Sequence, residues 1–213
     1  MPKPRFRRRK EERPQEITEA ALSAFAEKGY AATRVTDVAK RAGISKGLLY
    51  LYFKTKEDLF KAVIRSFVSP RIDALRSGIE QTDLTAEEYF RGPFLDFAKQ
   101  VPKSPARILV RLMIAEGARH PDLTAWYQEN VVSQGLAALR GLIERGVRNG
   151  EFKESALQEF PHMVIAPVLF AMVWSLVFDS RHKLDSDRFI ESHIGLILDA
   201  IKVSPGSKKA GAA

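Results

Sequence analysis

The hydrophobic positions of this chain recur at three- and four-residue intervals, and no segment sustains the two-residue alternation of a half-buried strand. Such spacing places apolar side chains along one face of a helix. The first apolar stripe runs from about Pro14 to Lys28 and ends at Gly29, and further stripes follow as far as Val203. The pattern therefore predicts an all-α protein.

Beyond residue 60 the stripes are interrupted by proline, glycine and short polar segments, which predict loops. The last two expected helices are strongly apolar, and the first of them is apolar nearly all round its middle. Two such helices from each of two subunits form a four-helix interface, so we expect a homodimer. The alternative is that both helices belong to a monomer core. The helices expected after residue 70 cover residues 71–81, 86–101, 106–118, 121–149, 157–180 and 187–203.

Residues 35–53 are predicted to form two short helices joined by a tight turn. Gly43 can adopt the positive φ that a sharp turn requires, and Ser45 can cap the second helix. In that helix Leu49 faces inward. A short helix with a buried back and an exposed front is typical of helix-turn-helix proteins, which insert it into the DNA major groove. The positions expected to face outward are Lys46, Gly47, Tyr50 and Leu51, with Leu48 and Tyr52 on the flanks.

With its flanks, this segment resembles the DNA-binding domain of the TetR (tetracycline-repressor-type) family of bacterial regulators. Three pieces in order carry the resemblance, AFAEKGY, TDVAKRAGISKG and LYLYFKTKEDLF, within residues 17–64. The resemblance implies a three-helix DNA-binding domain and an all-helical domain that binds a small ligand and dimerises. We therefore expect an all-α fold with an N-terminal three-helix helix-turn-helix domain and a C-terminal helical ligand-binding and dimerisation bundle.

These patterns divide the chain into four parts. Residues 1–12 are expected to form a basic disordered arm, and residues 204–213 a disordered tail. Residues 13–60 form the helix-turn-helix domain, and residues 61–203 the ligand-binding and dimerisation domain. The arm has two interpretations, a solvating tail or a segment that contacts phosphates or the minor groove.

The charge is distributed unevenly along the chain. The net charge is +8, and residues 1–60 hold 14 Lys and Arg against 8 Asp and Glu, whereas the remainder holds 20 against 18. A basic first third indicates a polyanionic partner for that part alone. The chain has no cysteine, which excludes disulfides and thiolate metal sites. The charged N-terminus has no apolar core after it, so we expect no signal peptide, a cytoplasmic location and no membrane partner.

The expected DNA contacts follow from the resemblance and from the outward positions. Lys46 and Tyr50 are expected to contact bases, and Gly47 to permit close approach of the backbone. Leu48 and Leu51 stand where relatives often carry a polar residue or histidine, which predicts contacts to phosphates and thymine methyl groups. The full expected set is Thr36, Ser45, Lys46, Gly47, Leu48, Tyr50, Tyr52 and Lys56, of which Thr36, Tyr52 and Lys56 are assigned to phosphates. As helix caps we expect Thr33 or Thr36 for the helix before the turn, and Thr55 for the helix after residue 55.

The expected ligand is a small apolar or amphipathic molecule, because drug-sized pockets are largely lined by apolar and aromatic side chains. Glu116 has two interpretations, an ion pair with an arginine or a carboxylate that lines the pocket. The candidate pocket residues are Phe94, Phe97, Met113, Glu116, Trp126, Tyr127, Phe170 and Trp174.

No nucleophile motif and no phosphate-binding glycine loop occurs, so we expect neither an enzyme nor a cofactor. Glu159 and His162 have a metal-ligand spacing, but Pro161 interrupts it and no second pair exists, so no metal is expected. The sequence predicts a transcriptional repressor that a small molecule releases from its operator. The alternatives are a non-sensing dimeric DNA-binding protein whose C-terminal half only dimerises, and a helical enzyme or carrier with a vestigial DNA-binding domain. The inducer, the operator and the sign of regulation are not determined by the sequence.

Overall fold

The computed structural model describes the backbone of residues 5–203 and the side chains from residue 13 onward. These residues form helices joined by turns, with one isolated β-bridge between Phe152 and Lys202, so the all-α prediction is confirmed. The predicted tail of residues 204–213 lies outside the described residues. The chain divides into two compact units, each with its own packing.

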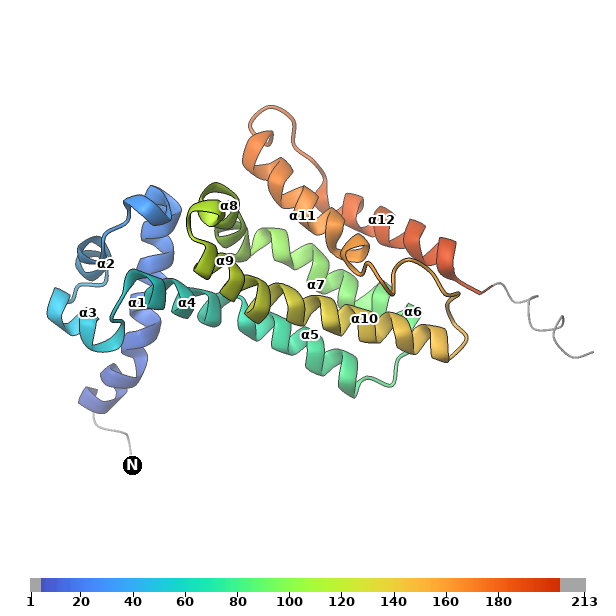
Figure 1. Cartoon of the computed structure of the whole chain (residues 1–213), viewed down its shortest axis with the longest axis horizontal. Helices are drawn as coiled ribbons and strands as arrows, with labels where there is room; N and C mark the ends of the chain where they lie inside the picture. The colour runs from blue at the N-terminus through green and yellow to red at the C-terminus, as the bar shows by residue number, and fades with distance from the viewer. Residues whose placement is uncertain (1–4, 204–213) are drawn as a thin grey trace, which may run out of the picture. The chain divides into compact units, whose positions relative to one another are not determined.

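Unit 1 contains the N-terminal helices, coloured blue to teal in Figure 1, and a later segment of residues 108–128. Helix α1 packs against α2 and α4, and α2 packs against α3. The rings of Phe25, Tyr30 and Phe60 lie with their centroids 5.1 to 5.6 Å apart and form an aromatic core. The helices of unit 1 are α1 (Arg5–Ala32), α2 (Val35–Arg41), α3 (Lys46–Tyr52), α4 (Lys56–Phe67), most of α8 (Ala106–Glu116), the 3-10 turn η3 (Gly117–Arg119) and α9 (Pro121–Tyr127).

The boundaries of α1 show how local sequence sets a helix length. The helix begins at Arg5 and contains Pro14, so its first turns overlap the segment predicted as a basic arm. Gly29 has a φ of 79°, in the left-handed region that glycine tolerates best, and it breaks the regular helix where the sequence predicts its end.

Unit 2 contains residues 72–107 and the described residues from 129 to 203. Helix α12 packs against α7 and α11, and α11 and α12 lie side by side in Figure 1. The elements of unit 2 are most of α5 (Ser69–Gln81), α6 (Ala86–Tyr89), the π-helix η1 (Phe90–Phe94), α7 (Leu95–Gln100), the 3-10 turn η2 (Val101–Lys103), most of the π-helix η4 (Gln128–Val132), α10 (Ser133–Arg148), α11 (His162–Val177) and α12 (Ser186–Ile201).

The helix predicted over residues 157–180 is shorter than expected. Helix α11 begins only at His162, after Pro161 at its N-cap position, and residues 156–159 form turns. Pro161 has no N–H to donate and disfavours helical backbone in the residue before it, so α11 starts directly after it. The helix predicted over residues 187–203 is confirmed as α12, with slightly different ends.

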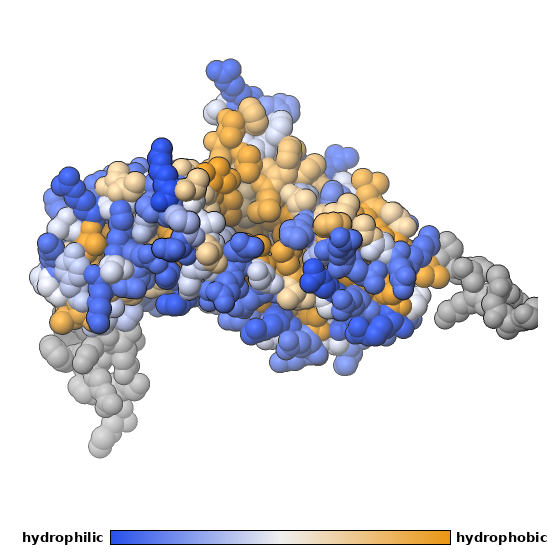
Figure 2. All heavy atoms as spheres, in the orientation of Figure 1, coloured by the Kyte–Doolittle hydropathy of each residue, from blue (hydrophilic) through white to orange (hydrophobic). Residues whose placement is uncertain are grey.

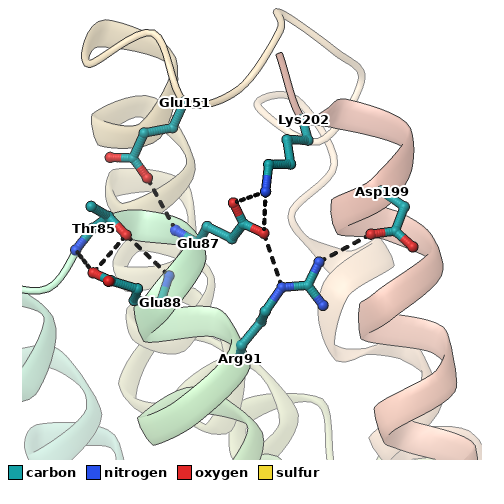
Figure 3. Close-up of polar contacts among 7 residues, drawn as sticks. All are labelled: Thr85, Glu87, Glu88, Arg91, Glu151, Asp199 and Lys202. Atoms are coloured by element: carbon teal, nitrogen blue, oxygen red, sulfur yellow. Dashed lines mark hydrogen bonds and ion pairs between the residues drawn. The ribbon is translucent and has the colours of Figure 1, made fainter. Parts of the chain in front are cut away.

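A group of charged side chains joins the end of α12 to α6 (Figure 3). The Glu87 carboxylate accepts hydrogen bonds from Lys202 at 3.0 Å and from Arg91 at 3.0 Å, and Arg91 also donates to Asp199 at 3.0 Å. The Glu151 carboxylate accepts from the backbone N–H of Glu87 at 3.1 Å. The hydrogen bond from Lys202, and then that from Arg91, hold the pKa of Glu87 below its ordinary value. Because exposed ion pairs each contribute little free energy, the group chiefly fixes how α12 ends against α6.

Helix α11 exposes much of its apolar surface. Figure 2 shows hydrophobic side chains gathered over the region where Figure 1 draws this helix. The exposed apolar residues of α11 are Met163, Leu169, Phe170, Val173 and Val177. Leu196 of α12 is exposed as well. Among the described residues, no helix combines the length and apolar content needed to cross a membrane.

Candidate DNA-binding surface and ligand cleft

The turn between α2 and α3 orients the second helix. Gly43 has a φ of 63°, which lets the chain reverse direction directly after α2. The Ser45 Oγ accepts a hydrogen bond from the backbone N–H of Leu48 at 3.1 Å, so Ser45 caps α3 as predicted. Leu49 is fully buried and anchors the back of the helix in unit 1. The opposite face of α3 is therefore left on the surface.

The exposed face of α3 carries Lys46, Gly47, Tyr50 and Leu51, in the orientation that the sequence predicts. The Lys46 Nζ lies 5.7 Å from the centroid of the Tyr50 ring, so the two side chains form one cation–π pair along this face. A Cβ atom added to Gly47 would meet no atom within 4 Å, so the fold itself does not require glycine there. Leu48 and Tyr52 are half-buried on the flanks. This face combines a positive charge, a phenol and an apolar side chain within two helical turns.

The start of α2 differs from the prediction, because neither threonine caps it. Thr33 is buried, and its hydroxyl donates to the carbonyls of Gly29 at 2.6 Å and Ala24 at 3.2 Å. These two carbonyls lie near the end of α1, so Thr33 is used to close that helix instead. Thr36 lies in the first turn of α2 and is exposed, which leaves its side chain accessible.

A carboxylate takes the capping role at α2. The Asp37 Oδ2 accepts from the backbone N–H of Arg34 at 3.1 Å and pairs with the Lys28 Nζ at 3.1 Å. The Arg34 hydrogen bond, followed by that of Lys28, lowers the pKa of Asp37. A reciprocal pair between Thr55 and Asp58 caps α4, which confirms Thr55 as the N-cap. The sequence signal for Asp37 was its position three residues after the N-cap residue Arg34, where carboxylates recur.

Lys56, predicted to contact phosphate, makes contacts inside unit 1. Its Nζ donates to the carbonyl oxygens of Tyr30 at 2.9 Å and Ala31 at 3.0 Å, and it lies 4.6 Å from the centroid of the Tyr30 ring. A cation at these carbonyls complements the negative end of α1. Burial lowers the pKa of Lys56, and the nearby Glu116 carboxylate opposes that shift. The ammonium group therefore connects the start of α4 to the end of α1.

Residues 108–128 belong to the same unit through contacts that local sequence patterns did not reveal. The Glu116 Oε1 accepts from the backbone N–H of Ala31 at 2.9 Å, although the two residues are 85 positions apart. The Glu116 Oε2 lies 3.7 Å from the His120 Nε2, and the His120 ring packs edge-on against Tyr30 at 4.8 Å. The partners of Glu116 are thus a backbone amide and a histidine instead of an arginine. The Arg111 guanidinium in turn donates to the carbonyl of Ala26.

The eight candidate pocket residues lie in separate places. Phe94 and Phe97 contact each other in unit 2, with ring centroids 6.2 Å apart. Phe170 and Trp174 pack together on α11 at 5.7 Å. In unit 1, Trp126 lies beneath the cationic groups of Lys61 and Arg65, and burial raises the pKa of Tyr127 to about 12. Four of the eight belong to unit 1, namely Met113, Glu116, Trp126 and Tyr127.

Unit 2 contains a cleft of about 480 Å³ between α5 and the segment from α6 to α7. Its wall is largely apolar, and none of the lining side chains is charged. The Tyr89 hydroxyl in the wall donates to the carbonyl of Leu75 at 3.4 Å. The lining residues are Ala74, Leu75, Gly78, Gln81, Thr82, Tyr89, Pro93 and Phe97. Of the predicted pocket residues only Phe97 lines this cleft. Sequence reasoning missed Ala74 and Gly78, because such small residues carry no recognisable sequence signal.

Comparison with known proteins supports the helix-turn-helix assignment. Residues 17–63 match the family model of bacterial regulatory proteins of the tetR family, and residues 94–185 match that of the tetracyclin repressor-like C-terminal domain. The HTH-type transcriptional regulator YfiR of Bacillus subtilis is 35% identical over 152 residues, which span 68% of this chain and 70% of YfiR. The HTH-type transcriptional repressor KstR2 of Mycolicibacterium smegmatis is 24% identical over 200 residues, or 93% of this chain and 95% of KstR2.

A solved structure supports the fold over nearly the whole chain. The transcriptional regulator FadR from Bacillus subtilis, solved in complex with stearoyl-CoA, superposes with a TM-score of 0.73 at 23% identity. The superposition covers 88% of this chain and 98% of FadR. Family models match both halves of the chain, and one relative exceeds 30% identity. These matches and the shared fold are consistent with an exposed helix α3 that reads DNA. The chain therefore belongs to the TetR family of bacterial DNA-binding transcriptional regulators.

Proposed function

We propose that this protein is a dimeric transcriptional repressor, acting in the cytoplasm, that an apolar or amphipathic small molecule releases from its operator. The observation that carries the ligand response is the cleft of unit 2. Its volume of about 480 Å³ falls within the range of roughly 300 to 1,000 Å³ that ligand pockets occupy. A non-sensing protein, whose C-terminal half only dimerises, has no use for such a cleft.

The chemistry of the cleft wall narrows the class of ligand. No charged side chain lines it, so the part of the ligand that it holds is uncharged. In the wall, Gln81 and Thr82 offer hydrogen bonds, and the ring of Phe97 offers apolar contact. An acyl chain with a polar head outside the cleft fits this arrangement. The relative FadR, solved with stearoyl-CoA, supports the choice of long-chain acyl thioesters as the first compounds to test.

A ligand can release the operator only if it binds the two conformations of the repressor with different affinity. The experiment measures fluorescence anisotropy of a labelled operator duplex bound by the full-length protein, during titration with stearoyl-CoA. We expect the acyl thioester to release the DNA, and free coenzyme A, which lacks the acyl chain, to leave it bound.

A variant that fills the cleft tests where the ligand acts. Ala74 is exposed in the cleft wall, so Ala74→Trp adds bulk there without disturbing the core. Ala137→Trp is the matched control, because Ala137 is equally exposed on α10 and does not line the cleft. We expect Ala74→Trp to bind DNA normally and lose the response, and Ala137→Trp to retain it. Release of both variants would contradict the cleft as the ligand site. If no acyl or apolar compound released the wild-type protein, the non-sensing alternative would be favoured.

The DNA contacts proposed for α3 rest on its exposed face. The Lys46 ammonium and the Tyr50 hydroxyl are the hydrogen-bonding groups exposed there, and we assign them to base edges in the major groove. Thr36 and Tyr52 are assigned to phosphates, which fix the position of the helix without reading sequence. Replacing both Lys46 and Tyr50 by alanine should abolish operator binding and leave dimerisation intact. Retained binding would contradict this assignment.

The dimer is proposed to form through α11 and α12. Four exposed apolar residues of α11, Leu169, Phe170, Val173 and Val177, follow the spacing of one helical face. Such a continuous apolar surface is unusual on a monomer and marks an interaction site. A second copy of the chain presents the same surface, so a two-fold axis buries both at once.

A further inference from the structure

Leu51 of α3 is the most exposed large hydrophobic side chain among the described residues, with 81% of its surface accessible. Single exposed leucines are common on proteins and need no special account. This one lies on the face that the family uses to approach DNA, in the last turn of α3. Leu48, on the flank of that face, is half-buried, as the sequence predicts.

The exposed face of α3 consists of two parallel rows, each one helical turn long. The first row runs from Lys46 to Tyr50, which form the cation–π pair and carry the polar groups. The second row runs from Gly47 to Leu51, four residues apart and therefore on one side of the helix. Gly47 has no side chain and open space where a Cβ would stand, so the backbone is uncovered at this end of the row, and the apolar Leu51 side chain forms the other end. It offers no side-chain hydrogen bond.

The major groove presents one apolar group on its base edges, the C5 methyl of thymine. We propose that the row from Gly47 to Leu51 packs against a thymine methyl, and that Leu51 makes the operator require thymine at one position of each half-site. Gly47 lets the helix backbone approach closely enough for the leucine to reach the base. This inference rests on DNA binding through α3, and it assigns to Leu51 a recognition role beyond that of Lys46 and Tyr50.

The folded protein gives an independent reason to test Leu51. A side chain that is four-fifths exposed contributes little to stability, and substitution of such a residue typically changes the unfolding free energy negligibly. Leu51→Ala should therefore fold normally, and any loss of affinity for DNA can be attributed to the lost contact between Leu51 and the DNA. Leu51→Met keeps an apolar side chain of similar volume and should retain the contact.

The experiment uses an operator that the full-length protein selects from a random pool of DNA duplexes. Each thymine of the half-site is then replaced by deoxyuridine, which removes the methyl group and keeps the base pair. We expect one position at which uracil weakens wild-type binding about four-fold, the effect of burying a single methyl group. Leu51→Ala should bind the thymine and uracil duplexes equally, and Leu51→Met should discriminate as the wild type does.

Ile114→Ala is the control, because Ile114 of α8 is another aliphatic residue with 65% of its surface exposed and lies away from α3. It should discriminate thymine from uracil as the wild type does. The proposal is overturned if uracil has no effect at any position, or if Leu51→Ala loses the same factor as the wild type. A pool that yields no enriched sequence would overturn sequence recognition by α3 itself, which is a different result from an enriched operator that tolerates uracil.

Discussion

Lys56 offers the sharpest test of the structure, because two different roles predict opposite results. The family resemblance assigns its ammonium to a DNA phosphate, whereas the structure places the Nζ on the carbonyls of Tyr30 and Ala31 and over the Tyr30 ring. The informative substitution is Lys56→Met, which removes the charge and keeps most of the aliphatic stem.

The expected loss of stability follows from these contacts. A hydrogen bond to a charged group contributes about 1.5 to 3 kcal/mol, and an exposed cation–π contact about 0.5 to 1 kcal/mol. The bond to Tyr30 is partly buried and the bond to Ala31 is exposed, so the second adds little. The desolvation that lowers the pKa of Lys56 offsets part of these gains, so we expect Lys56→Met to lower the unfolding free energy by about 1 to 2 kcal/mol. If the ammonium makes no phosphate contact, the salt dependence of DNA binding should stay unchanged.

The assay combines urea unfolding, followed by circular dichroism, with operator binding measured across a series of salt concentrations. Loss of one phosphate contact lowers the slope of log K against log salt by about 0.9. Lys54→Met is the matched control, because Lys54 is exposed beside α3 and its substitution should not alter stability. Unchanged stability of Lys56→Met together with a shallower salt slope would refute the structural role and establish the phosphate contact.

Three further predictions concern other parts of the chain. Gly146→Ala should destabilise the protein by about 1 to 3 kcal/mol, because the new Cβ would clash with the buried Phe152 ring. Gly141→Ala in the same helix, where a Cβ meets open space, should be neutral or stabilising. Equal urea midpoints for the two variants would contradict this prediction. Val173→Glu should convert the proposed dimer to a monomer, as measured by sedimentation velocity. Leu84→Glu is the control and should leave the dimer intact, because Leu84 is as exposed as Val173 but lies outside α11 and α12. A Val173→Glu variant that stays dimeric would show that α11 is not part of the interface. The pKa of Asp37 is depressed in the folded state, so its contribution to stability is present above the ordinary value of 3.8 and is lost as the pH falls through the lower folded value. Asp37→Asn should flatten the acid side of the urea midpoint plotted against pH, and an unchanged profile would show that Asp37 is not responsible.

The local features of the N-terminal domain were predictable because they depend on neighbours in the chain. Gly29 and Gly43 end helices through their own backbone freedom, and Ser45 caps α3 by reaching an N–H three residues away. The cap of α2 was mispredicted as Thr33 or Thr36, whereas Asp37 accepts from the backbone N–H of Arg34. The hydroxyl of Thr33 is instead bonded to carbonyls of α1, a contact that the local pattern of α2 does not contain.

The cleft proposed to bind ligand shows the opposite case. Six aromatic residues, Met113 and Glu116 were selected as pocket candidates from the sequence, yet of these only Phe97 lines the cleft, together with small residues such as Ala74 and Gly78. A cavity is defined by which surfaces fail to meet after packing, and hydrophobic patterning records only which side chains avoid water. The sequence therefore predicts that an apolar interior exists and does not predict where it is hollow.

The sequence by itself determined the all-α fold class, the helix-turn-helix and the outward face of α3, because helical periodicity and turn chemistry act over a few residues. Tertiary structure alone decided that the Glu116 carboxylate accepts a hydrogen bond from the backbone N–H of Ala31, 85 residues away, and that Lys56 bonds to carbonyls at the end of α1. It also decided that the Thr33 hydroxyl bonds to carbonyls near the end of α1. The physical reason is that hydrogen-bond partners and burial are set by whichever distant surfaces come within a few ångströms, and one sequence position carries no record of them.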